Sequence, residues 1–212
     1  LNKIPRESGP LDAVFPMAYP SLSAAAADHD IQEIRKKFGA PEGSLIACYC
    51  GNIGFQTDFD TFLAAARSLT ATSMPIHFVI AGSGPREDEL RAKAANMANV
   101  TVPGWLSGTE LTELFHVSSF GLIGFFNITD YMSSLPNKFS EYLSAGLALV
   151  CGTKGEMERW ITDFDCGITY ESMNSVSLVR ALSNLSTRRS DLERIKNNAR
   201  NLHNSHFDLS VV

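Results

Sequence analysis

The chain has 212 residues, of which 44% are hydrophobic and 19% are charged, and its formal net charge is −5. This composition suffices to bury the core of one domain, and the acidic balance disfavours a nucleic-acid-binding protein, because such proteins usually carry a basic patch. No apolar run approaches the roughly 20 residues that cross a bilayer, and the first residues contain no signal-peptide core.

Residues 1–20 contain four prolines and show no hydrophobic periodicity. We expect them to form an irregular connector that enters a domain from something upstream. The periodic patterns that follow predict one domain over residues 21–212.

Helical patterns alternate with short apolar runs along this domain. The first helix is predicted around Ile31, Ile34 and Phe38, with Asp28 or Asp30 as its start signal and Gly39 as its end. Four further helices are predicted. One begins with Thr57 and Asp60, and the next has Pro85 in its first turn. The other two lie near 110–117 and over 136–145. Residues 127–135 are expected to be a polar loop. Two helices end the chain, the last opening with a capping box of Ser190 and Glu193.

Six apolar runs are predicted to be strands, over 45–50, 76–81, 100–102, 121–125, 147–151 and 167–170. They are short and do not alternate with polar residues, which is typical of parallel strands buried on both faces. The predicted fold class is therefore α/β, with a doubly wound, Rossmann-like parallel sheet.

The four cysteines and the aspartate pairs do not indicate a metal site. Three cysteines lie in or beside predicted strands, where cysteine behaves as a small hydrophobic residue, and Cys48 and Cys50 share one strand face. Asp-x-Asp occurs at Asp28/Asp30, Asp58/Asp60 and Asp163/Asp165. The first two pairs resemble helix starts and the third a turn, so we expect no metal and no disulfide.

In an open α/β sheet, ligands bind beyond the carboxyl ends of the strands. The segments that follow the predicted strands are 51–54, 82–85, 104–106, 127–138 and 152–155, and four of the five contain glycine. Glycine lets the backbone approach a ligand closely, and helix amino termini favour an anion such as a diphosphate. An ordinary strand-to-helix turn would explain each glycine by itself; their meeting at one edge favours a binding site.

The strongest local signal is the stretch from Ser133 to Gly146, with Pro136, Asn137 and Lys138 at a predicted helix start. A cation in the first turn opposes the helix dipole, so Lys138 there indicates that an anion shares the site. Glu141 lies one turn further on. The alternative is a surface pair between Lys138 and Glu141, while Phe139, Tyr142 and Leu143 are expected to face the core.

The pattern Pro136-Asn137-Lys138-x-x-Glu141-Tyr142-Leu143-x-Ala145-Gly146 is similar to a motif of retaining glycosyltransferases of family 4. Three further features match in order: Gly51-Asn52-x-Gly54, Ala81-Gly82-x-Gly84-Pro85, and Val102-x-Gly104-Trp105-Leu106. The resemblance covers about residues 45–185. It implies the C-terminal half of a GT-B enzyme, which has two Rossmann-like domains with the active site between them.

The resemblance implies roles for individual residues toward a nucleotide-diphospho-sugar donor. Glu141 would accept hydrogen bonds from the ribose hydroxyls, and the backbone around Trp105 and Leu106 would contact the base. Lys138 and the amides of Leu135, Pro136 and Asn137 would hold the diphosphate, although proline itself has no amide proton. Gly51, Asn52, Gly54 and Gly82 would lie close to the donor. Retention, no obligatory metal, and UDP as the default nucleotide follow from the family, as does a role in glycan or surface polysaccharide biosynthesis.

Two positions depart from the family pattern. The family often carries a glutamate eight residues before Glu141, where this chain has Ser133. The loop after the first strand usually supplies an arginine or lysine, but residues 55–58 (Phe-Gln-Thr-Asp) contain neither. Lys138 is then the one cation evident from the sequence near the donor.

Two other functions remain open. A catalytically silent nucleotide-sugar-binding module would fit both departures. A dinucleotide-dependent oxidoreductase is the second alternative, although Gly82-Ser83-Gly84 lacks the third glycine of the dinucleotide fingerprint.

The partners implied are the donor and an acceptor-binding N-terminal domain that lies outside this sequence. Membrane association is expected only through that missing half. The expected location is the cytoplasm, with a peripheral position at the inner face of the membrane as the alternative. The 212 residues alone are expected to lack transfer activity.

Overall fold

The computed structural model describes residues 30–71 and 75–210. The expected connector over 1–20 and the start signal Asp28 lie outside these ranges, as does the predicted start of the domain at residue 21.

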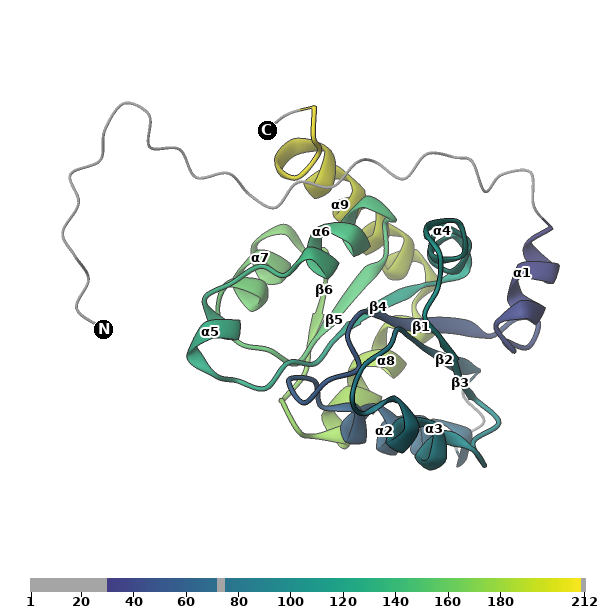
Figure 1. Cartoon of the computed structure of the whole chain (residues 1–212). Helices are drawn as coiled ribbons and strands as arrows, with labels where there is room; N and C mark the ends of the chain where they lie inside the picture. The colour runs from purple at the N-terminus through teal and green to yellow at the C-terminus, as the bar shows by residue number, and fades with distance from the viewer. Residues whose placement is uncertain (1–29, 72–74, 211–212) are drawn as a thin grey trace, which may run out of the picture.

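The described residues form a sheet of six parallel strands with helices on both faces (Figure 1). The spatial order is β3-β2-β1-β4-β5-β6. The strands are β1 (Leu45–Cys50), β2 (Ile76–Ala81), β3 (Val100–Gly104), β4 (Phe120–Ile123), β5 (Ala148–Cys151) and β6 (Gly167–Thr169). The strand order reverses between β1 and β4, so a crevice for a ligand is expected at their carboxyl ends. The predicted doubly wound, Rossmann-like fold is confirmed.

The helices form two layers, one on each face of the sheet. One layer contains α1 (Ile31–Lys37), α4 (Gly108–Val117), α6 (Asn137–Ser144) and α7 (Glu156–Phe164). The other contains α2 (Phe59–Ala71), α3 (Glu87–Ala94) and α8 (Ser175–Thr187). The last helix, α9 (Arg189–His206), contributes to both cores, and the short helix α5 (Thr129–Met132) follows β4.

Both faces of each central strand are buried, which explains why the strand sequences show no polar alternation. In β1, Ile46, Cys48 and Cys50 pack into the core beneath α4 and α6, and Ala47 and Tyr49 pack into the core beneath α2. Cys48 and Cys50 therefore share one face, as predicted. All four cysteines are free and buried.

The structure corrects the prediction of several helix boundaries. Residues 127–135, expected to be a loop, contain α5, and α7 lies where no helix was predicted. Pro85 lies in a turn before α3 rather than in its first turn. The side chain that caps α2 is Asp58, which accepts from the Thr61 amide at 3.1 Å, and not the buried Thr57.

The predicted capping box of the last helix is wrong. Ser190 already lies inside α9, which begins at Arg189 without a side-chain cap. The one complete capping box that the described helices show is on α4, where Ser107 and Glu110 exchange hydrogen bonds. Asp30 caps α1 as predicted, by accepting from the Gln32 amide at 2.8 Å.

Within the described ranges, no helix has both the length and the apolar character that crossing a membrane requires. The same residues contain no cluster of three or more histidine, cysteine, aspartate or glutamate side chains that could hold a metal ion.

Candidate donor-binding site

The loops that follow β1, β2 and β3 are joined by backbone hydrogen bonds into one wall. The Gly51 amide donates to the Ala81 carbonyl at 3.1 Å, and the Gly82 amide donates to the Gly104 carbonyl at 2.7 Å. Gly82 has a φ of +137° and lies so close to Gly51 that a Cβ atom at position 82 would overlap the Gly51 carbonyl oxygen. Only glycine allows this approach, so the glycines of these loops pack against each other as well as face the cavity.

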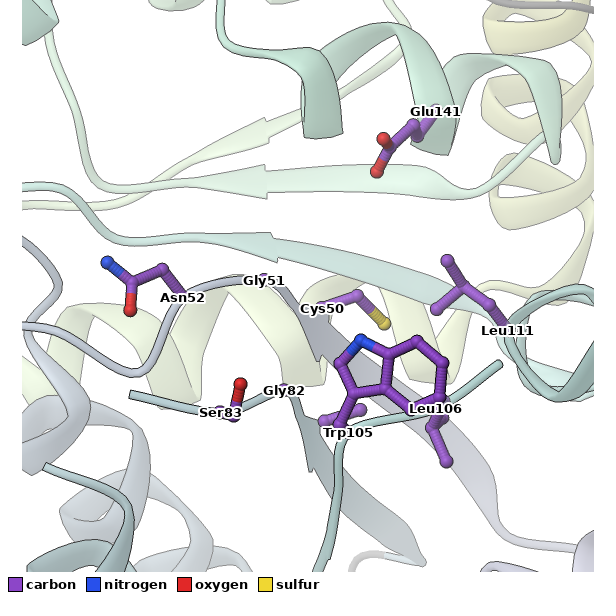
Figure 2. A pocket seen from close by; sticks show the side chains of 10 residues that line it. Cys50, Gly51, Asn52, Gly82, Ser83, Trp105, Leu106, Leu111 and Glu141 are labelled. Atoms are coloured by element: carbon purple, nitrogen blue, oxygen red, sulfur yellow. The ribbon is translucent and has the colours of Figure 1, made fainter. Parts of the chain in front are cut away.

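A cavity of about 440 Å³ opens beside this wall, at the carboxyl ends of β1 and β2. Figure 2 shows Glu141 directed from α6 toward the strand ends, with Trp105 on the opposite side and Cys50 and Gly51 between them. The lining residues are Cys50, Gly51, Asn52, Ala81, Gly82, Ser83, Trp105, Leu106, Leu111 and Glu141.

The two sides of the cavity differ in chemistry. Trp105 presents an indole that is 72% exposed, next to Leu106 and to Leu111 of α4. A flat aromatic and apolar surface of this kind suits a planar base. Glu141 faces it with a carboxylate that can accept two hydrogen bonds. Burial raises the pKa of Glu141 above its usual value, while nearby Lys138 opposes that shift.

Core packing fixes the direction of Glu141. Its neighbours Phe139, Tyr142 and Leu143 are fully buried, as predicted. The Tyr142 hydroxyl oxygen also accepts a hydrogen bond from the Cys50 amide of β1 at 2.9 Å, which ties α6 to that strand. With one face of α6 held by these contacts, Glu141 is left at the cavity.

Lys138 lies in a more enclosed place than the sequence indicated. The residue is only 8% exposed, and its Nζ atom lies 3.7 Å from the ring centre of Tyr49 and 4.8 Å from that of Phe125. We call Tyr49 and Phe125 the aromatic box. A side chain at position 51 would meet Nζ at 3.2 Å, so the ammonium lies directly against Gly51.

The Lys138 ammonium makes no hydrogen bond and no ion pair with any residue in the described part of the chain. A surface pair with Glu141 is therefore not formed. Burial lowers the pKa of Lys138 to about 7, against the attraction of Cys50 and Glu141. A largely enclosed cation that makes no hydrogen bond or ion pair is costly, and an anion bound at this end of α6 would relieve that cost.

The predicted site residues fall into two groups. Gly51, Asn52, Gly82, Trp105, Leu106 and Glu141 line the cavity. Lys138 lies just behind Gly51, whereas Gly54 is buried in its turn. At the start of α6, Leu135 packs against the core, Pro136 occupies the N-cap position and Asn137 is exposed.

Four of the lining residues were not assigned to the site from the sequence: Cys50, Ala81, Ser83 and Leu111. Cys50 and Ala81 are the last residues of β1 and β2. The predicted strand ends therefore already indicated that they lie at the carboxyl edge of the sheet. Leu111 could not be found in this way, because only the packing of α4 brings it beside Trp105. In addition, the amide of Gly51 is bound to β2 and is not free to contact a phosphate.

Both departures from the family pattern are visible in the structure. The Ser133 hydroxyl donates to the Thr129 carbonyl at 2.8 Å, so it completes the last turn of α5. In the loop after β1, Asp58 caps α2. Neither position supplies the charge that many family members have there.

The remaining aspartate pairs serve local structure. Asp163 lies 3.8 Å from Arg159, and Asp165 pairs with Arg194 of α9. Asp60 pairs with Lys93 at 2.7 Å. None of these pairs lines the cavity.

The fold and the place of the cavity define an α/β domain of the GT-B type with a cavity at the carboxyl edge of its parallel sheet. A family model confirms this class. The chain belongs to the glycosyl transferases group 1 family, whose model matches residues 30–202. No curated protein matches the chain in sequence.

Solved structures agree on the fold. WaaG, a glycosyltransferase involved in lipopolysaccharide biosynthesis, superposes with a TM-score of 0.71 at 19% identity, over 90% of this chain and 51% of that protein. The C-terminal domain of a glycosyl transferase group 1 family protein (LpcC) from Francisella tularensis gives 0.69 at 15% identity, over 91% and 97%. Anabaena HepE in complex with UDP-glucose gives 0.70 at 13% identity, over 85% and 49%.

The chain thus spans about half the length of WaaG and HepE and nearly all of the LpcC domain. It corresponds to the C-terminal domain of a GT-B glycosyltransferase.

Proposed function

We propose that this chain is the donor-binding domain of a retaining family 4 glycosyltransferase, and that it binds a nucleotide-diphospho-sugar in the cavity between Trp105 and Glu141. UDP is the proposed nucleotide; HepE, which shares the fold, is described in complex with UDP-glucose. Synthesis of a surface polysaccharide or related glycan is the proposed role. WaaG, a second structure with this fold, is involved in lipopolysaccharide biosynthesis.

The observation that carries this proposal is the enclosed Lys138 ammonium, which makes no hydrogen bond or ion pair with the described residues, next to a cavity lined by the Glu141 carboxylate. The base would lie on Trp105 and Leu106, and the ribose hydroxyls would donate to Glu141. The diphosphate would then pass over Gly51 toward Lys138 and the start of α6, which favours negative charge. During transfer, the leaving diphosphate gains negative charge, and Lys138 would stabilise it there.

Replacement of Glu141 tests the nucleoside end of this site. We expect Glu141→Ala to weaken UDP binding by at least about tenfold, since a charged acceptor of two hydrogen bonds is lost, with little change in thermal stability. Glu141→Gln should weaken binding less, because the amide oxygen still accepts. Isothermal titration calorimetry measures both.

Glu33→Ala is the matched control, because it removes an exposed glutamate of α1. It should bind UDP as the wild type does. Unchanged affinity of Glu141→Ala for UDP would remove Glu141 from the site and with it the proposed position of the ribose.

A catalytically silent binding module is the second candidate, supported by Ser133 and by the absence of a cation in residues 55–58. Both candidates bind a nucleotide-sugar; they differ in turnover once an acceptor domain is present. If the chain were instead a domain of a dinucleotide-dependent oxidoreductase, it would bind NADH and not UDP. Parallel titration with UDP and NADH separates that alternative, and a thermal-shift screen with UDP, GDP, ADP and their sugar conjugates identifies the nucleotide.

A further inference from the structure

The loop that follows β5 is fixed to the loop that follows β4 by three contacts. The buried Thr153 hydroxyl donates to the Phe125 carbonyl at 3.0 Å, and the Lys154 amide donates to Asn127 Oδ1 at 2.8 Å. Gly155 has a φ of +92°, and a Cβ atom there would overlap the Met132 carbonyl. The backbone of Lys154 is therefore held on both sides at the carboxyl edge of the sheet.

The side chain of Lys154, by contrast, is exposed and makes no hydrogen bond or ion pair with the residues of 30–71 and 75–210. Three other described lysines form ion pairs: Lys37 lies 2.8 Å from Glu113, Lys93 lies 2.7 Å from Asp60, and Lys196 lies 3.7 Å from Glu193. The backbone of Lys154 is thus held in place, while its side-chain ammonium remains available to bind an anion.

Phe125 connects this lysine to the proposed donor site. Its carbonyl anchors Thr153, and its ring is one wall of the aromatic box around the Lys138 ammonium. β4 and β5 are neighbours in the sheet, and the loop that carries Lys154 is bound to the loop after β4, which also supplies the Phe125 ring beside the Lys138 ammonium. The cavity that would hold the nucleoside is on the other side, at β1 and β2.

We propose that Lys154 is a second cation of the donor site, which binds the end of the diphosphate distal to the nucleoside. This rests on the proposed function. Lys154 would supply the positive charge that residues 55–58 lack, and it would do so from the β5 side of β4 rather than from the β1 side. Asn127 is the positioning residue, because its side chain fixes the Lys154 backbone.

The test compares UDP with UMP, which lacks the distal phosphate, on the full 212-residue chain at one pH. We expect Lys154→Ala to weaken UDP binding on the order of tenfold, as for a lost hydrogen bond to a charged group, and to leave UMP binding unchanged. Lys154→Arg should restore most of the UDP affinity. Asn127→Ala should shift the UDP affinity in the same direction by a smaller factor, because Lys154 remains but is less well placed.

Lys36→Ala is the matched control, since Lys36 is an exposed lysine of α1 and does not line the cavity. It should bind both nucleotides as the wild type does. The inference would be overturned if Lys154→Ala bound UDP like the control, or if it weakened UDP and UMP equally. If wild-type chain bound no UDP at all, the proposed function would fall and this inference with it.

Discussion

At the scale of single residues, Lys138 has the most unusual environment in the described part of the molecule. Two aromatic faces favour its ammonium form by roughly 0.5–2 kcal/mol, yet burial disfavours the charge more strongly and lowers the pKa to about 7. Near neutral pH, the free protein therefore contains both the ammonium and the neutral amine.

This environment predicts proton-linked binding of the donor. A diphosphate favours the ammonium, so binding above pH 7 requires uptake of a proton, and the affinity should fall by up to about tenfold per pH unit as the pH rises from 7 to 9. UDP-glucose is the suitable probe, because its diphosphate has no terminal phosphate group to titrate. The measurement is the dissociation constant, with the proton uptake obtained by calorimetry in buffers of different ionisation enthalpy.

Other groups near Lys138 do not produce the same dependence. Burial raises the pKa of Glu141, so it loses charge as the pH falls, and burial raises the pKa of Cys50 well above its ordinary value, so its thiol stays protonated. Lys138→Arg keeps its charge at every pH used and should remove the dependence. A wild-type affinity that is constant from pH 6 to 9 would contradict the prediction.

At the scale of secondary structure elements, α4 supplies one wall of the cavity through Leu111, and its first turn is held by the capping box. The Ser107 amide donates to Glu110 Oε2 at 2.9 Å, and the Glu110 amide donates back to Ser107 Oγ at 3.4 Å. Glu110 also lies 3.2 Å from Lys37 of α1. This helix start thus joins two elements of the same layer.

Loss of this cap should destabilise the protein. We expect Ser107→Ala to lower the free energy of unfolding by about 1 kcal/mol, since the Glu110 amide loses its acceptor, and Ser107→Asp to preserve it. Urea unfolding measures the difference.

Ser190 offers a matched comparison, because the sequence shows the same capping pattern there but the residue is exposed inside α9. Ser190→Ala should change the free energy of unfolding by no more than about 0.5 kcal/mol. Equal effects of the two substitutions would mean that the α4 cap makes no special contribution.

At the scale of the whole molecule, the carboxyl edge exposes large apolar side chains, of which Trp105 lines the cavity. Phe55 is 71% exposed and Trp105 is 72% exposed, and both follow strands of the sheet. If the proposed function holds, we expect an acceptor-binding domain to face this edge.

We therefore expect the 212-residue chain to bind the donor but not to transfer the sugar. Hydrolysis or transfer of UDP-glucose by the chain alone should equal the uncatalysed background, because the proposed function assigns the acceptor and its base to a separate acceptor-binding domain. Release of UDP over time, with and without that half supplied on a second chain, is the measurement. Clear turnover by the 212 residues alone would contradict this expectation.

The sequence by itself determined the fold class and the edge of the sheet at which chemistry can occur. Apolar runs such as residues 45–50 and 76–81 must be buried on both faces, and a chain of alternating strands and helices places their following loops at one edge. This reasoning placed Gly51 and Gly82 at the same edge, because it depends only on local pattern, whereas Glu141, which lines the same cavity, was assigned through the resemblance to the family motif.

The tertiary structure alone decided which charges are available at that edge. Lys138 is enclosed because Tyr49 and Phe125, which come from other segments, pack around it, and Lys154 is placed because Asn127 binds its backbone. Such contacts join residues that are distant in sequence, so no local period records them. For the same reason, the short helix α5 and the true cap of α2 became visible only in the folded chain, where long-range packing outweighs local propensity.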